Sequence, residues 1–275
     1  MKKFFIATAI VVAGSTAAQS ADLPARVHTM APPPVAVYSW TGCYIGGNAG
    51  WIGGDRIDLY PSGSLADPAI ISPVDARINS HNYTPQGSAT VGAQIGCNWQ
   101  MDRFVVGAEA DFNASFNQNA SETFGNLPKS VVGNWTPHTE NVSKKLDWFS
   151  TYRLRAGYAF DRFYIYGTGG FAVGRFNAAT SYDAFTVNNF SFAGSTTSTR
   201  FGYAVGAGLE YLMTERWTLK AEYLYLDFGS FSFDSPNILV ASASLWGTTV
   251  RAREHVARAG INYKFDWAVP VVAKY

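Results

Sequence analysis

The stretch between residues 199 and 227 constrains the fold of this chain more than any other part of the sequence. It contains two runs in which residue character alternates at period two, joined by Met213-Thr214-Glu215-Arg216. Period-two alternation on both sides of a short turn predicts a β-hairpin. One face of this hairpin is apolar and aromatic: Phe201, Tyr203, Val205, Ala207, Leu209, Tyr211, Trp217, Leu219, Ala221, Tyr223 and Tyr225.

The opposite face of the hairpin carries glycine, alanine and the charged residues Glu210, Lys220 and Glu222. A soluble barrel or sandwich places its large apolar side chains inside and leaves charge outside. Here the apolar face has no apolar counterpart on the inner side of the strands. We therefore predict that the aromatic face meets lipid.

The same alternation recurs along the chain, in residues 41–52, 89–100, 104–113, 146–158 and 254–265. In the run 146–158 it predicts Leu146 and Trp148 outward and Asp147 inward. A further run, 163–176, has small residues on both faces, so its facing stays open. Together with the hairpin these runs make eight expected strands. The fold class is all-β: an eight-stranded antiparallel up-and-down transmembrane β-barrel.

The connections between these strands alternate in length. Three are short turns, and four are expected loops of roughly 20 to 35 residues at 53–85, 116–144, 177–198 and 229–253. Short periplasmic turns and long external loops are typical of outer-membrane barrels. A soluble eight-stranded barrel such as a lipocalin is the alternative, but it would need large apolar residues on the inner face.

The two ends of the chain differ from the barrel region. Residues 1–20 contain Lys2-Lys3, an apolar run and then small residues, which predicts a cleaved secretory signal peptide. A membrane helix would need about 20 apolar residues, roughly twice this run. The expected organisation continues with a Pro-rich periplasmic tether (21–38), the barrel (39–265) and a C-terminal extension (266–275). The net charge of +1 indicates no nucleic-acid partner.

Charged residues recur on the inward face of five expected strands, and we predict that they form an interior charge network. They are Glu109, Asp111, Arg153, Arg155, Glu210, Lys220, Glu222, Arg258 and Lys264. An eight-stranded barrel has room inside only for its own side chains. Unpaired buried charges cost several kcal/mol, so these residues should pair. A salt-bridged plug is the favoured interpretation, and a narrow gated conduit is the alternative.

The two cysteines, Cys43 and Cys97, fall on the outward face of neighbouring antiparallel strands at the same rim. A cross-strand disulfide fits this placement, since the secretory route is oxidising. It would close a loop of about 54 residues. Two free thiols acting as small apolar residues fit the sequence as well.

No catalytic, metal or cofactor site is predicted. The four histidines, His28, His81, His138 and His255, show no metal-ligand spacing. Barrel enzymes place Asp, His and Ser near the external rim, and Asp75, His81, His138 and Asp183 are candidates of that kind. Chance residues on long loops give the same pattern, so we expect no enzyme.

Aromatic residues gather at the outward strand ends, as expected for two interfacial girdles. One group lies beside the short turns: Trp40, Trp99, Phe104, Tyr158, Phe163, Tyr211, Trp217, Tyr263 and Phe265. The other lies nearer the long connections: Trp51, Phe112, Trp148, Phe201 and Tyr225.

Six segments carry a resemblance to a known family: WTGCYIGGNAGW, VGAQIGCNWQ, VGAEADF, GYAVGAGLEY, LKAEYLYLDFG and GINYKF. They resemble the small outer-membrane β-barrel proteins of alphaproteobacteria, called outer-membrane immunogenic or surface-antigen proteins, whose barrel is similar to the OmpA membrane domain. The resemblance implies an abundant surface protein of the outer membrane with no established catalytic residues. Such barrels commonly end on an aromatic insertion signal, for which Phe265 and Tyr275 are the two candidates.

The expected role is therefore structural and surface-exposed: envelope integrity and surface antigen. The expected partners are outer-membrane lipid, lipopolysaccharide and the barrel-assembly machinery, with the chain as a monomer. A small porin-like channel for ions or solutes is the first alternative, and an outer-membrane barrel enzyme is the second.

Overall fold

The structure is a computed structural model that describes residues 38–54, 57–63, 81–83, 87–116, 120–124, 138–184, 190–236 and 244–265. All of these lie in one compact unit, Tyr38–Tyr275. The predicted signal peptide, nearly all of the predicted tether, the extension 266–275 and Tyr275 lie outside the described residues. The described residues include no helix long and apolar enough to cross a membrane.

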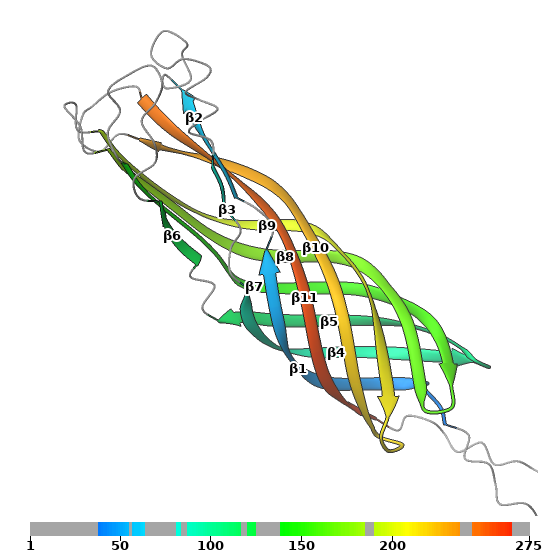
Figure 1. Ribbon diagram of the computed structural model, residues 1–275. Helices are drawn as coiled ribbons and strands as arrows, with labels where there is room; N and C mark the ends of the chain where they lie inside the picture. The colour runs from blue at the N-terminus through cyan, green and yellow to red at the C-terminus, as the bar shows by residue number, and fades with distance from the viewer. Residues whose placement is uncertain are drawn as a thin grey trace, which may run out of the picture. The chain divides into compact units, whose positions relative to one another are not determined.

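Eight antiparallel strands close into a single ring, which confirms the predicted fold (Figure 1). In ring order they are β1 (Gly42–Gly54), β4 (Ser88–Met101), β5 (Phe104–Phe116), β7 (His138–Phe160), β8 (Phe163–Ala184), β9 (Phe190–Leu212), β10 (Trp217–Pro236) and β11 (Ser244–Lys264). The ring closes where β1 pairs with β11, with Tyr44 opposite Lys264 and Gly54 opposite Glu254.

Three shorter strands add to this ring. Strand β2 (Ile57–Gly63) pairs with β11, β3 (His81–Tyr83) pairs with β2, and β6 (Ala120–Phe124) pairs with β7. At the other end, two tight turns place Asp102 and Asp161 at φ 55° and 50°. Aspartate tolerates this left-handed backbone better than most residues do, which explains its place in both turns.

Several strands continue where loops were expected. Strands β8 and β9 extend through most of residues 177–198, and β10 and β11 extend into 229–253. Strand β7, with 23 residues, begins at His138 inside the expected loop 116–144. The loop prediction was wrong there because Ser, Thr and Asn also occur on strands whose period-two alternation continues. A membrane-crossing strand needs about 9–11 residues, so these strands reach beyond the bilayer.

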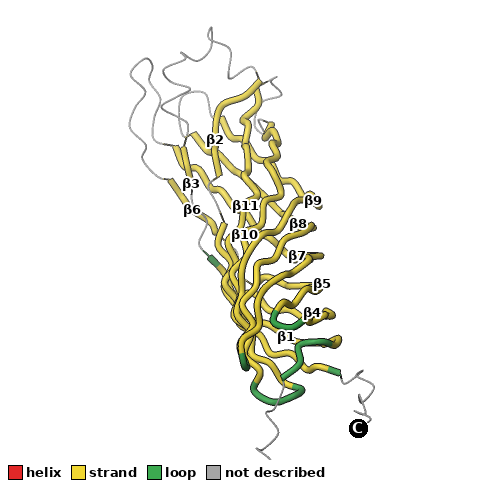
Figure 2. Tube along the Cα trace, turned by 90° about the vertical axis from the view of Figure 1, so that its right-hand side faces the viewer, coloured by secondary structure: helices red, strands yellow, loops and turns green. Residues whose placement is uncertain are grey.

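The extended part of the barrel consists of two facing layers. Pairing between β9 and β10 ends at Tyr203 opposite Asp227, whereas β8 stays paired with β9 and β10 with β11. The inner faces of these two pairs meet, since Thr180 Oγ1 lies 3.1 Å from Thr248 Oγ1. The rings of Phe176 and Phe231 pack 6.2 Å apart. Figures 1 and 2 show these strands continuing past the ends of β1 and β4.

Alternation decides which side chains face out. Phe201, Phe171 and Leu154 are 79%, 76% and 71% exposed, whereas Arg153, Arg155 and Glu210 on the same strands are buried. The facing of residues 163–176 is also clear, because Tyr164, Tyr166, Ala172 and Phe176 are buried inside. The outer surface of the ring is thus apolar and aromatic over the part that crosses the membrane.

One inward–outward assignment on β7 was wrong. Leu146 is fully buried inside the barrel and Asp147 lies on the outside, the reverse of the prediction. The reason is a β-bulge: the register with β8 shifts between Leu146, opposite Phe176, and Trp148, opposite Arg175. A bulge adds one residue to a strand and so reverses the alternation on one side of it.

Candidate functional site

The middle of the barrel interior is an ionic layer built from eight of the nine predicted inward charges. Their side chains come from β5, β7, β9, β10 and β11, and all are buried. The four acidic members are Glu109, Asp111, Glu210 and Glu222, and the four basic members are Arg153, Arg155, Lys220 and Arg258. The layer is therefore electrically balanced.

Arg153 on β7 is the centre of this layer. Its guanidinium donates from Nη2 to Glu109 Oε1 (2.6 Å) and Asp111 Oδ2 (3.0 Å) on the neighbouring strand β5. It also donates from Nη1 to Glu222 Oε1 (2.9 Å) on β10, across the lumen. A planar guanidinium with several fixed donors suits such multiple pairing.

Two further cations complete the central cluster. Arg258 donates from Nη2 to Asp111 Oδ2 (2.8 Å) and to Glu222 Oε2 (2.6 Å). Lys220 donates to Glu109 Oε1 at 2.5 Å and lies 3.4 Å from Glu222 Oε1. Glu109, Asp111 and Glu222, the three carboxylates of this cluster, thus each meet at least two cations. Buried charges require such pairing.

Arg155 lies toward the periplasmic side of this cluster, among tyrosine rings. It donates to Glu109 Oε2 (2.8 Å), and its Nη2 lies 2.7 Å from Glu210 Oε1. Its guanidinium carbon is 5.4, 5.2 and 4.4 Å from three ring centroids, those of Tyr44, Tyr164 and Tyr166. Cation–π contacts and charge pairing together hold this arginine in place.

Two of these tyrosines also donate hydrogen bonds to the ionic layer, and each ring packs over a glycine on the neighbouring strand. The Tyr44 hydroxyl donates to Glu109 Oε2 (2.6 Å), and the Tyr166 hydroxyl donates to Glu222 Oε1 (2.9 Å). Tyr44 is the register partner of Gly96, and Tyr166 of Gly208. A Cβ on Gly96 would lie 2.3 Å from the Tyr44 hydroxyl, so the glycine leaves room for the ring.

Lys264 does not belong to the ionic layer. Its ammonium lies at the periplasmic rim, where it donates to the Ser39 carbonyl oxygen at 2.5 Å. The alternation along β11 predicts its side correctly, but the position is one step from the end of the strand. The inclusion of Lys264 in the network was therefore wrong.

An apolar layer closes the barrel on the periplasmic side. It consists of Trp40, Val105, Ala159, Tyr164, Tyr166 and Leu212, with Tyr38 packed against it. Trp40 is only 2% exposed, so its assignment to the outer aromatic girdle was wrong. The residue precedes β1 and turns inward, where its ring packs 5.3 Å from that of Tyr164. Its backbone N–H donates to Gln100 Oε1 (2.7 Å), which anchors the turn.

A larger apolar layer fills the interior on the extracellular side. It includes Ile52, Val142, Leu146, Phe149, Phe176, Leu224, Leu226, Phe228, Phe231, Val250 and Val256. The expectation that the aromatic face of the hairpin has no apolar interior behind it was therefore wrong for this half, since Leu224 and Leu226 are fully buried. They continue the face of Lys220 and Glu222 along β10.

A second buried ion pair, absent from the predicted set, lies within this extracellular half. Lys144 Nζ is 2.8 Å from Glu254 Oε1, and the two side chains are 2% and 0% exposed. The Lys144 ammonium also donates to the Arg251 carbonyl oxygen (3.2 Å). Lys144 lies within the expected loop 116–144, and only a continued period-two pattern through residues 142–146 indicates that it is on a strand.

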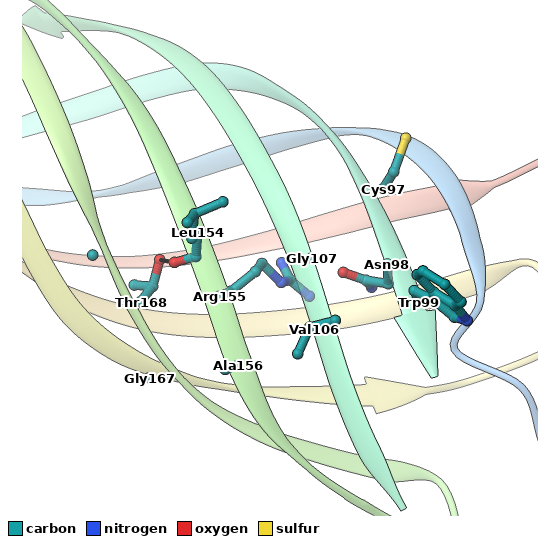
Figure 3. Close-up of a pocket in the computed structure, with 11 residues that line it drawn as sticks. Cys97, Asn98, Trp99, Val106, Gly107, Leu154, Arg155, Ala156, Gly167 and Thr168 are labelled. Atoms are coloured by element: carbon teal, nitrogen blue, oxygen red, sulfur yellow. Dashed lines mark hydrogen bonds between the residues drawn. The ribbon is translucent and has the colours of Figure 1, made fainter. Parts of the chain in front are cut away.

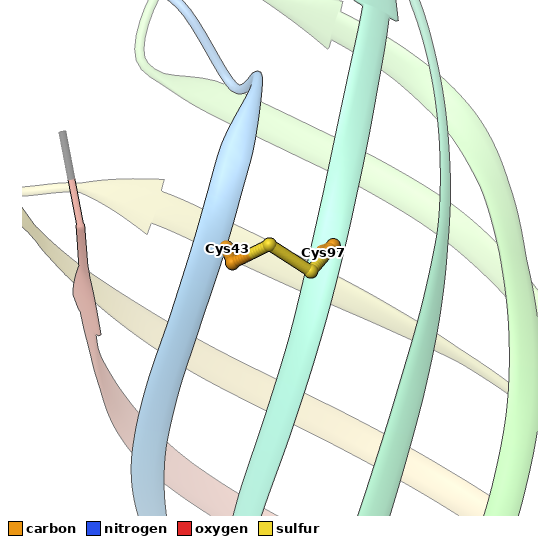
Figure 4. The surroundings of a disulfide bond; sticks show 2 residues. All are labelled: Cys43 and Cys97. Atoms are coloured by element: carbon orange, nitrogen blue, oxygen red, sulfur yellow. A yellow bond between two sulfur atoms is a disulfide. The ribbon is translucent and has the colours of Figure 1, made fainter. Parts of the chain in front are cut away.

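Cys43 and Cys97 form a disulfide across β1 and β4 (Figure 4). They are direct register partners, with Cα atoms 3.9 Å apart. The bond lies near the periplasmic ends of both strands. It joins the strand that closes the ring to the strand that follows it in the barrel, and so fixes their register.

The outer surface has a shallow depression of about 790 Å³ beside this disulfide (Figure 3). Trp99, Val106 and Leu154 form its walls, and Gly107, Ala156, Gly167 and Gly169 leave its floor at the level of the backbone. It lies on the apolar, lipid-facing side of the ring. Small residues between larger ones account for it without a specific ligand.

The candidate catalytic residues lie on three strands or outside the described residues. His81 lies on β3, while His138 and Asp183 lie on the neighbouring strands β7 and β8. Asp75 lies outside the described residues. Among the described residues no group of three or more His, Cys, Asp or Glu is placed to hold a metal ion.

A closed antiparallel ring with an apolar outer face, aromatic strand ends and a charged, packed interior defines a transmembrane β-barrel. The chain belongs to the family described as outer membrane protein beta-barrel domain, which it matches over residues 6–265. It is therefore a β-barrel of the outer membrane, as the sequence motifs predict.

Known relatives agree with this placement. The chain is 33% identical to the 31 kDa outer-membrane immunogenic protein of Brucella melitensis, over 96% of this chain and 100% of the relative. It is 28% identical to the 22 kDa outer membrane protein of Rhizobium leguminosarum, over 71% and 68%. Among solved structures, OprG from Pseudomonas aeruginosa aligns over 83% of this chain and 98% of that one, with a TM-score of 0.44 and 14% identity.

Proposed function

We propose that the protein is a structural, surface-presenting barrel that conducts no solute and catalyses no reaction. It stabilises the outer membrane and displays its long hairpins to the environment. The observation that carries this proposal is the stacking of three filled layers inside the barrel, two apolar and one ionic. Side chains of the described residues from opposite walls meet in each layer, which supports a closed interior.

A pore is the main rival function, and the ionic layer is the feature that favours it. For ions to pass, Arg153 would have to exchange Glu222 for another partner, and the apolar layers on both sides would have to open. Each step exposes a buried charge or apolar surface, which costs several kcal/mol. Static closure is therefore the better interpretation of this interior.

The absence of enzymatic activity is part of the same proposal. Relatives that cover 96% of the chain are named as immunogenic outer-membrane proteins and not as enzymes. Among the described residues, the charged groups of the ionic layer pair with one another, which supports a role without catalysis. Surface display fits both the relatives' names and the strands that continue beyond the bilayer.

The proposed partners follow from the surface of the barrel. Its apolar outer face contacts acyl chains, and its extracellular border contacts lipopolysaccharide. Phe265 follows β11 directly, and its backbone N–H donates to the Cys43 carbonyl oxygen (2.9 Å). This aromatic residue at the end of the last strand suits a signal for the barrel-assembly machinery. We propose that the protein acts as a monomer.

Two experiments test this role. An epitope tag inserted between Ala184 and Phe190 should bind antibody on intact cells, because β8 ends and β9 begins at the extracellular end of the barrel. Labelling only after permeabilisation would refute surface display. Liposomes that contain the refolded protein should swell no faster in small sugars than protein-free liposomes. Swelling that grows with protein content would refute a closed interior and support the pore.

A further inference from the structure

Two β-bulges lie at the same border of the barrel, just beyond the outer aromatic residues. One is at Asp147 on β7, and the other lies between Asp227 and Ser230 on β10. Each bulge presents an aspartate on the outside of the barrel, next to basic side chains. The register relates the two bulges: Arg175 pairs with Trp148 and with Thr199 on β9, and Asp227 pairs with Tyr203, further along β9. The tilt of strands in a closed barrel brings these offset positions to one height.

At the first bulge one carboxylate organises two cations. Asp147 Oδ1 lies 3.2 Å from Lys145 Nζ, and Asp147 Oδ2 lies 4.0 Å from Arg175 Nε. Asn177 Nδ2 also donates to Asp147 Oδ2. The Lys145 and Arg175 side chains remain 43% and 51% exposed. Asp147 therefore holds the two cations close together while both stay accessible from outside the barrel.

The second bulge has a similar arrangement with a single cation. Asp227 Oδ2 accepts from Arg253 Nε (3.1 Å), and Asp227 Oδ1 accepts from the Gly229 backbone N–H (2.8 Å). The Arg253 side chain is 43% exposed although the aspartate beside it is only 13% exposed. Together the two bulges carry three cations and two carboxylates, a net charge of +1.

This charged border contrasts with the surface below it. From the bulges to the periplasmic turns, the outward side chains of the eight ring strands include no Asp, Glu, Lys or Arg in the described residues. The charged border thus begins where the apolar band ends. In an outer-membrane barrel that is the depth of the outer-leaflet headgroups.

We propose that Lys145 and Arg175 form a binding site for the phosphate groups of outer-leaflet lipid, with Arg253 at the second bulge as a similar site. Arginine pairs with phosphate through several donors, and lysine adds a point charge. Asp147 holds Lys145 and Arg175 in place, and the exposed parts of these two side chains face the headgroups. The proposal deepens the proposed contact with lipopolysaccharide by naming the chemistry and the residues.

The test compares lipid retention by full-length protein variants in nanodiscs of phosphatidylcholine. The probe is an acylated glucosamine disaccharide that carries two phosphates, and the same lipid without phosphates is its reference. Bound lipids are counted by native mass spectrometry. The variants are Lys145→Gln with Arg175→Gln, and Arg253→Gln. Arg103→Gln is the matched control, because Arg103 is an exposed arginine at the opposite rim whose Nη1 donates to Tyr158.

The wild type and Arg103→Gln should retain the phosphorylated lipid preferentially. Retention should fall roughly fivefold for each cation removed at the bulges, since a basic residue near an anionic surface contributes about that factor. Equal retention by the double variant and the control would overturn the site. Displacement of the lipid by millimolar inorganic phosphate would overturn the assignment to lipid, and loss of binding with a chelator would overturn direct contact.

Heat-dependent gel mobility establishes that each variant is folded before lipids are counted. The result is independent of the proposed structural role. Failure of lipid retention leaves surface labelling and liposome swelling unchanged. Conversely, a protein that fails the swelling test can still retain the phosphorylated lipid. That result refutes a closed interior and leaves the phosphate site in place.

Discussion

Arg153 and Glu222 form an ion pair across the barrel lumen, although their strands are not neighbours in the ring. The contact joins Arg153 Nη1 on β7 to Glu222 Oε1 on β10 at 2.9 Å, and both side chains are fully buried. Strands β8 and β9 separate the two in the ring. Ladder hydrogen bonds hold neighbouring strands only, so this pair adds a link across the lumen that the sheet itself does not provide.

Removal of one partner of this pair should destabilise the barrel strongly. In Arg153→Ala three carboxylates lose a cation, and in Glu222→Ala three cations lose a carboxylate. Breaking a buried pair in this way costs roughly 3–5 kcal/mol. Urea unfolding in lipid vesicles, followed by the heat-modified gel band, should show a lower midpoint for both variants.

The exposed pair of Lys145 and Asp147 is the matched control for this prediction. Surface pairs contribute at most about 1 kcal/mol, so Asp147→Ala should shift the midpoint little. The double variant of Arg153 and Glu222 should cost less than the sum of the single variants, because the charges share partners. Single variants that unfold like the wild type would contradict the network.

A side chain at Gly96 or Gly208 should displace a tyrosine from the ionic layer. The Cβ of Gly208→Ala would lie 2.4 Å from the Tyr166 hydroxyl, and that of Gly96→Ala would lie 2.3 Å from the Tyr44 hydroxyl. Overpacking of this kind costs about 1–3 kcal/mol. Gly167→Ala is the control, because nothing lies within 4 Å of its Cβ position. Equal stability of all three variants would refute close packing of tyrosine on glycine.

Trp40 and Trp99 lie near the same rim on opposite sides of the wall, and lipid-borne quenchers should distinguish them. Trp40 is 2% exposed inside the barrel, whereas Trp99 is 66% exposed on the outside. In single-tryptophan variants, brominated acyl chains should quench Trp99 and leave Trp40 largely unaffected. Strong quenching of Trp40 would place it in the outer girdle instead and remove it from the periplasmic layer.

Loss of the disulfide should weaken the closure of the ring. Cys43 and Cys97 are 54 residues apart, and a bridge over such a loop typically contributes roughly 2–4 kcal/mol. Cys43→Ala, Cys97→Ala and the double variant should unfold at the same lower urea concentration. Reductant added to unfolded wild type should produce that same value on refolding. Two alkylated thiols in unreduced protein would show that no bridge forms.

The sequence predicts the ring well because a transmembrane barrel imposes period two on every strand. The hairpin of residues 201–225 and the inward charges from Glu109 to Arg258 follow from that period alone. Errors arise where another effect changes the period or the end of a strand. The bulge at Asp147 inverts Leu146, and the inward turn before β1 takes Trp40 out of the girdle.

The layers of the interior could not be predicted from single strands. Strand tilt in a closed barrel brings Glu109, Arg153 and Glu222 to one height, and this height depends on the register of every pair around the ring. The ion pair of Lys144 and Glu254 joins two strands whose upper parts were expected to be loops. Serine- and threonine-rich strands beyond the bilayer lack the apolar face that makes the membrane part recognisable.

The most direct test of a closed interior is the single-channel record of the refolded protein in planar bilayers. We predict no stable conductance steps for the wild type, because the ionic layer lies between two apolar layers. Glu210→Gln and Arg153→Ala serve as comparison variants, since each loosens the ionic layer alone. Stable steps in the wild type that vanish or change size in either variant would contradict the closed barrel and establish a conducting pore.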